Sequence, residues 1–144
     1  MPLFLGVLVA TAGCDSSTRP NEANTAVDAA ANNAAGTAPA YDVSRSVTTI
    51  SPNLYRAMAD TMNMRILEAV YQPGDSSIVH AHPDFAMYIL EGSMVELTAA
   101  DGKKQQVDFK KGMAVIMPAD THSAKNIGSS ALRIIVVEVN RPRE

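Results

Sequence analysis

The chain has 144 residues, 47% of them hydrophobic, and a formal net charge of -3 at pH 7, which fits one globular domain and leaves little room for a second. Lys and Arg form no cluster along the chain, so the sequence lacks the basic surface that binding to nucleic-acid phosphates requires. The single cysteine excludes an intrachain disulfide and a thiolate zinc cluster, so any bound metal must be held by nitrogen and oxygen ligands.

Residues 1–14, MPLFLGVLVATAGC, form an apolar run with the length of a signal-peptide core that is too short to cross a bilayer. Its end resembles the lipid-attachment signal of bacterial lipoproteins, although Thr11 stands where leucine is usual and no basic residue precedes the run. The resemblance implies a signal segment that ends at a lipidated Cys14, and hence an anchor on the extracytoplasmic side of a bacterial membrane. Asp15 resembles the signal for retention in the inner membrane of enteric bacteria. The alternative is an irregular start with a chance cysteine.

Residues 15–40 contain one large aliphatic residue, Val27, among small and polar ones. Such a segment cannot bury a core, so it is predicted to be a flexible linker between the anchor and the folded part. The folded domain is therefore expected to span residues 41–144.

From Tyr41 onward, short segments rich in Val, Ile, Leu and Met alternate with turn residues every eight to twelve positions. This texture is typical of an antiparallel β-sandwich or β-barrel. Segment 41–53 is interpreted as an entering strand or arm. The nine other predicted strands are 54–59, 64–71, 76–80, 85–90, 94–98, 105–109, 114–117, 123–126 and 132–139.

Two of the three histidines of the chain, His80 and His82, are separated by one residue. Residues two apart on a strand project from the same face, so these imidazoles are expected side by side, where they could share a metal ion. An isolated pair of this kind is more often a pair of surface histidines. The position of the third histidine, His122, favours metal ligands over surface histidines, as the spacing of the surrounding residues indicates.

Two blocks of sequence that contain these histidines resemble the two motifs of the cupin family, over roughly residues 54–139. The matching residues are Gly74, His80, His82 and Gly92 in the first block, and Gly112, Pro118, His122 and Asn126 in the second. The resemblance implies an all-β fold, a cupin-type double-stranded β-helix (a jelly-roll β-barrel), with His80, His82 and His122 as metal ligands. A homodimer is expected from the resemblance alone.

The sequence departs from the family pattern at two positions. Phe85 falls where the family has a glutamate ligand, and Asp120 replaces the usual glycine before His122. Asp84, the nearest carboxylate, would have to swing in from a loop. A site of three neutral imidazoles suits Fe(II), Zn(II), Ni(II) or Cu(II) and excludes Mg(II) and Ca(II), and the residues do not choose among the four.

The residues predicted to line a pocket around the metal are Phe85, Met87, Tyr88, Met117 and Asn126. Tyr88 is expected in the core with its hydroxyl at the rim, and Asn126 in a turn or behind the ligands. Glu68 and Glu138 interrupt apolar strands and could face the pocket, but they are interpreted as solvent-facing, the commoner position of a carboxylate on a strand. Seven methionines between positions 58 and 117 are interpreted as filling core gaps.

Three protein ligands leave positions open for water, oxygen or a chelating substrate. Two classes of function follow. The first is an oxygenase- or isomerase-like enzyme acting on a small molecule, and the second is a non-catalytic protein that binds a metal or a small ligand. The sequence contains no serine triad, phosphate loop or carboxylate pair that would support another catalytic mechanism, and the fold alone does not decide between the two classes.

Overall fold

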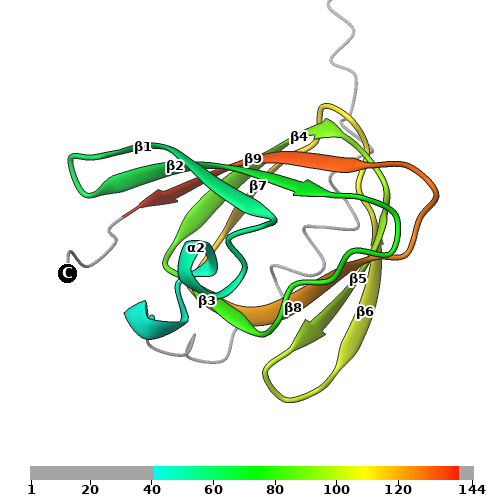
Figure 1. Ribbon diagram of the computed structural model, residues 1–144, viewed down its shortest axis with the longest axis horizontal. Coiled ribbons are helices and arrows are strands. Elements are labelled where there is room, and N and C mark those ends of the chain that lie inside the picture. Colours follow the sequence, from blue (N-terminus) through cyan, green and yellow to red (C-terminus); the bar gives the residue numbers. More distant parts are fainter. Residues whose placement is uncertain (1–40, 140–144) are drawn as a thin grey trace, which may run out of the picture.

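The computed structural model describes residues 41–139, and these residues form two antiparallel β-sheets packed face to face (Figure 1). The predicted signal segment, lipidated Cys14 and linker lie outside the described residues. Among residues 41–139, no helix is long and apolar enough to cross a membrane. The all-β jelly-roll fold predicted from the sequence is confirmed.

One sheet has five strands in the order β1-β2-β9-β4-β7, and the other has four in the order β3-β8-β5-β6. The strands are β1 (Tyr55–Thr61), β2 (Met64–Tyr71), β3 (His80–His82), β4 (Phe85–Glu91), β5 (Met94–Ala99), β6 (Lys104–Asp108), β7 (Ala114–Met117), β8 (Asp120–Asn126) and β9 (Leu132–Val139).

Side chains alternate between the two faces of each strand, and this alternation determines which residues reach the core. In β9, Leu132, Ile134 and Val136 face inward and are buried, whereas the residues between them face outward. Strand β2 pairs with β9 along its whole length and buries Leu67 and Ala69 in the same way. The inner faces of the two sheets together form one hydrophobic core, which continues along the barrel to the histidines.

The segment before β1 is helical, so the prediction of an entering strand or arm was wrong. A short 3-10 helix, η2 (Val43–Arg45), is followed by one turn of α-helix, α2 (Val47–Ile50). The Asp42 side chain accepts a hydrogen bond from the Ser44 amide at 3.0 Å and caps the first turn. Val47 is fully buried in the core, so α2 closes the side of the barrel next to β3 (Figure 1).

Two further predictions need correction. The third strand was expected at residues 76–80 but lies at His80–His82, because Ile78 and Val79 turn their side chains to solvent and residue 76 makes only an isolated bridge. The methionines do not all fill the core. Met58, Met62 and Met64 are exposed on the β1–β2 hairpin, which projects from the body of the barrel (Figure 1).

Candidate metal centre

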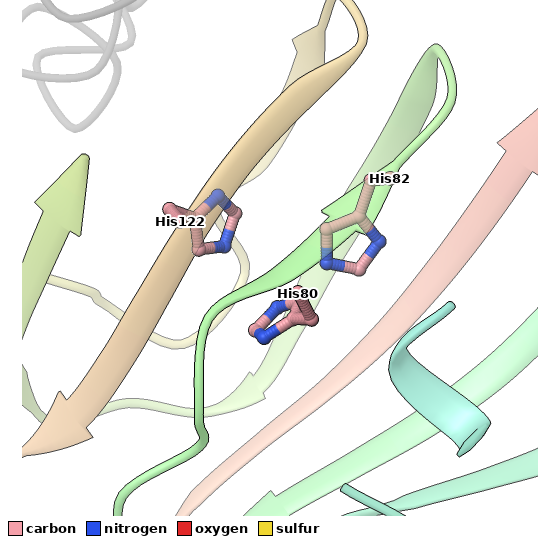
Figure 2. Close-up of side chains that lie close together, drawn as sticks. All are labelled: His80, His82 and His122. Atoms are coloured by element: carbon pink, nitrogen blue, oxygen red, sulfur yellow. The ribbon is translucent and has the colours of Figure 1, made fainter. Parts of the chain in front are cut away.

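The pairing of β3 with β8 brings the three histidines together. The two strands are antiparallel, with His80 opposite His122 and His82 opposite Asp120. Because the side chains at positions 80 and 82 share one face of β3, all three imidazoles project from the same side of this strand pair (Figure 2). That side is the barrel interior, and His80 and His82 are buried there.

The three rings are close enough to share one ion. One ring nitrogen from each histidine lies within 4.8 Å of the others. The ring of His80 is 4.9 Å from those of His82 and His122, centroid to centroid, and the latter two are 5.4 Å apart. Small rotations of the side chains therefore suffice to bring the three nitrogens onto a single ion.

The Nδ1 atom of each histidine forms a hydrogen bond with an oxygen atom. His80 Nδ1 lies 2.8 Å from the Ile78 carbonyl, His82 Nδ1 lies 2.8 Å from Glu138 Oε1, and His122 Nδ1 lies 2.7 Å from Asp120 Oδ2. An Nδ1–H that donates to such an acceptor fixes the tautomer, leaves the lone pair on Nε2 and makes the ring a stronger ligand. The three Nε2 atoms are thus the atoms that would bind a metal at this site.

The environment of His80 gives the clearest indication that the three histidines could bind a metal. Its Nε2 atom is buried and has no hydrogen-bond partner among the described residues. Burial, and to a lesser degree the neighbouring His122 and His82, together lower the pKa of His80 to about 3. Burial also lowers the pKa of His82, against the opposing effect of Glu138. Both imidazoles are therefore neutral at pH 7, as metal ligands must be, and the residues fit a divalent transition metal.

Glu138 is part of this centre, which corrects its interpretation as a solvent-facing residue. It is fully buried on the inner face of β9. Burial raises its pKa, but the hydrogen bond from His82 and the positive charge of Arg65 outweigh that effect, and the pKa is lowered overall. Because His82 is itself neutral, it contributes a hydrogen bond but no charge, and Arg65 supplies the permanent positive charge that balances the Glu138 carboxylate.

Arg65 links the metal centre to the N-terminal helical segment. It lies opposite Glu138 in the β2–β9 pair, and its Nε and Nη2 atoms donate to Glu138 Oε2 at 2.9 and 2.7 Å. Its remaining donors reach Ser46 Oγ at 2.9 Å and Thr48 Oγ1 at 3.0 Å. A continuous buried chain of hydrogen bonds thus runs from His82 through Glu138 and Arg65 to the start of α2.

Sequence reasoning missed this chain, although a signal was present. Glu138 and Arg65 occupy inward positions of β9 and β2, but both faces of these strands carry apolar residues, so period-two alternation alone leaves two orientations for each. A buried charge needs a partner, and two opposite charges at inward positions could have been paired on that ground.

The other acidic residues have different roles. Asp120 is partly exposed, and the hydrogen bond from His122 lowers its pKa despite partial burial. Asp84 is exposed and accepts a hydrogen bond from the Ala119 amide at 2.9 Å, so it is not part of the cluster. Glu68 lies on the outer side of β2, as predicted, but it is covered by its ion pairs with Arg56 and Arg133 and is only 9% exposed.

A cavity of about 950 Å³ adjoins the histidines, and His82 and His122 form part of its wall. Three of the predicted pocket residues, Phe85, Met87 and Met117, line this cavity. The Phe85 ring packs on His82 with a centroid distance of 4.8 Å. It therefore presents an apolar surface beside the metal centre and offers no ligand atom.

Tyr88 and Asn126 do not line the cavity, contrary to prediction, although Asn126 lies at a turn, as was also expected. Tyr88 follows the inward-facing Met87 and therefore projects from the outer face of β4, where it is 48% exposed. Asn126 is fully buried behind the cavity wall and ties together the turn after β8. Its amide donates to the carbonyls of Tyr71 and Ser130, and its Oδ1 accepts from Ser93 Oγ and the Gly128 amide.

Replacing Arg65 tests the role of the buried chain. Arg65→Met should weaken Zn(II) binding by roughly 10- to 100-fold, because Glu138 loses the charge that balances it and His82 loses its fixed orientation. Competition with a chelating dye measures the affinity, and the absorption bands of the Co(II)-loaded protein report ligand geometry. Arg65→Lys keeps the positive charge but loses the paired donors of the guanidinium group. Its Zn(II) affinity should lie between those of the wild-type protein and Arg65→Met.

Arg133→Met is the matched control, because it removes an ion pair with Glu68 on the outer face of the same sheet. It should leave metal affinity and the Co(II) spectrum unchanged. Equal losses of affinity in Arg65→Met and Arg133→Met would contradict a specific role for Arg65.

Comparisons with known proteins agree with this architecture. A family model described as "Cupin domain" matches residues 67–138. Among solved structures, a cupin domain from Bordetella pertussis Tohama I aligns with a TM-score of 0.56 at 16% identity, over 60% of this chain and 91% of that one. The polyketide cyclase RemF from Streptomyces resistomycificus is 27% identical, with a TM-score of 0.48, over 62% of this chain and 66% of its own. No curated protein matches the chain. The chain belongs to the cupin family.

Proposed function

We propose that this cupin binds one divalent transition metal ion through His80, His82 and His122, and presents the ion to a small organic molecule in the adjoining cavity. One observation carries the proposal. Three imidazoles converge with every Nδ1 hydrogen-bonded to an oxygen, while the buried Nε2 of His80 has no hydrogen-bond partner among the described residues. An ion at this point would satisfy that atom and bind all three rings.

The metal, whether iron, zinc, nickel or copper, would supply a Lewis acid or an oxygen-activating centre with coordination positions free for a ligand. The protein's own residues define what surrounds those positions. Phe85 packs its ring against that of His82 and gives this side of the site an apolar surface. Glu138 and Asp120 hold the rings of His82 and His122 in place. The cavity supplies the volume for a small molecule.

A metalloenzyme of oxygenase or isomerase type is the first candidate function. The second, a non-catalytic protein that binds a metal or a small ligand, is favoured by one feature of the site. The two carboxylates next to the histidines are both engaged, Glu138 with His82 and Arg65, and Asp120 with His122. Neither is free to act as a general base, so an enzyme would depend on the bound metal for most of its chemistry.

Metal content tests the site directly. Protein purified without chelators should contain about one transition-metal ion per chain, and the variant with His80, His82 and His122 all changed to Ala should contain none. Elemental analysis identifies and counts the metal, and circular dichroism checks that the variant keeps its β structure. Asp84→Ala serves as control, because it removes a nearby carboxylate outside the cluster. Unchanged metal content in the triple variant would remove the site.

Oxygen uptake separates the two candidate functions. For an oxygenase, Fe(II)-loaded protein should consume oxygen only in the presence of a molecule that binds the cavity, and His122→Ala should abolish the uptake. An oxygen electrode with a panel of small apolar compounds makes the measurement, and chromatography of the same mixtures detects an isomerised product. Tight binding of metal and compound with neither oxygen uptake nor a new product would contradict the enzyme and favour the non-catalytic alternative.

The proposal extends to location through the N-terminal sequence. The apolar run of residues 1–14, which ends at Cys14, supports a lipid anchor on the extracytoplasmic side of a bacterial membrane. Residues 15–40 would then act as the tether. The expected homodimer stays a prediction.

Cell fractionation tests the anchor. In a bacterial host, the full chain should be found in the membrane fraction and should incorporate labelled fatty acid. Cys14→Ser should move the protein to the soluble fraction and abolish labelling, because the thiol is the attachment point. Identical partitioning of the two proteins would contradict the anchor.

A further inference from the structure

Two tyrosines form a hydrogen-bonded pair on the wall of the cavity, next to the metal centre. Tyr55 opens β1 and Tyr71 closes β2, and both are almost completely buried. Their rings meet edge to face with centroids 5.9 Å apart, and both line the cavity. The Tyr55 ring lies 5.7 Å from that of His80 and 6.2 Å from that of His82, centroid to centroid. A molecule bound beside the histidines would therefore contact Tyr55.

The hydroxyl of Tyr55 is left with a proton to donate. The Tyr71 hydroxyl donates to the Tyr55 oxygen at 2.9 Å, and none of the hydrogen bonds within residues 41–139 takes up the proton of Tyr55 itself. A phenol keeps its proton at neutral pH, so the Tyr55 hydroxyl is a donor that a ligand can satisfy.

The rest of the inner wall offers almost no polar groups. The apolar residues that line it include Phe85, Met87, Val95, Phe109, Ile134 and Val136. The charged lining residues other than the histidines and Asp120 belong to the β5–β6 hairpin, where Lys103 pairs with Asp101 and Lys104 with Glu96, and both lysine side chains are exposed. Away from the histidines, a charged group deep in the cavity would lose its hydration without gaining an oppositely charged side chain as a partner.

We propose that the ligand of this cavity is a largely apolar, uncharged molecule with a carbonyl-type oxygen, and that Tyr55 selects it by donating a hydrogen bond to that oxygen. Tyr71 positions the Tyr55 hydroxyl through the hydrogen bond between them. This inference rests on the proposed function only in taking the cavity as the ligand site, because the Tyr55 contact does not require a metal.

A matched pair of probes tests this selection. The compounds 1-acetylnaphthalene and 1-ethylnaphthalene have nearly the same size and shape, but only the first carries a carbonyl oxygen. Dissociation constants are measured by ligand fluorescence for wild-type protein, both metal-free and Zn(II)-loaded. The acetyl compound should bind about fivefold to tenfold more tightly, the effect of one neutral hydrogen bond. Tyr55→Phe should remove this preference and leave the affinity for the ethyl compound unchanged.

Retained binding of the ethyl compound shows that the Tyr55→Phe cavity is intact. Tyr88→Phe is the matched control, because it removes a hydroxyl from an exposed tyrosine on the outer face of β4 and should leave the preference unchanged. Equal affinity of wild-type protein for the two compounds, no measurable binding of either, or an unchanged preference in Tyr55→Phe would each overturn the inference. Metal content, measured separately, would still report on the three-histidine site.

Discussion

The antiparallel register of β3 with β8 is the constraint on which the metal centre depends. Pairing His80 with His122 and His82 with Asp120 places three imidazoles and one carboxylate on the inner face of the strand pair. Side chains alternate between faces, so a slip of β3 by one residue would turn both of its histidines out of the barrel. Strand β3 is only three residues long, so its register must be fixed by its neighbours.

The buried chain from His82 to α2 supplies part of that support. Glu138 holds His82, Arg65 holds Glu138, and the hydroxyls of Ser46 and Thr48 take the remaining donors of Arg65. Residue 46 also forms a bridge with residue 81, between the two histidines of β3. A buried ion pair contributes little net stability compared with apolar packing, but breaking it is costly because it leaves a buried charge unpaired. The chain therefore couples the position of His82 to correct folding of the helical segment.

Much of the fold could be predicted from the sequence, because alternating apolar residues and regularly spaced turn residues determine the strands directly. The three histidines could be identified because their spacing repeats a known pair of motifs, and the structure brings them together. Segment 43–50 could not be assigned correctly, since its helices are too short to show helical periodicity. Glu138 was misplaced because a single carboxylate in an apolar strand has two possible orientations, and the partner that decides between them is 73 residues away.

The central claim is that His80, His82 and His122 hold one metal ion through their Nε2 atoms. The most direct measurement is an X-ray structure of protein purified without chelators, with anomalous data collected at the absorption edge of the metal found by elemental analysis. The account predicts a single anomalous peak at about 2.0–2.2 Å from the Nε2 atom of each histidine. A peak bound to other residues, or three imidazoles that remain apart with no peak between them after incubation with each of the four metals, would contradict it.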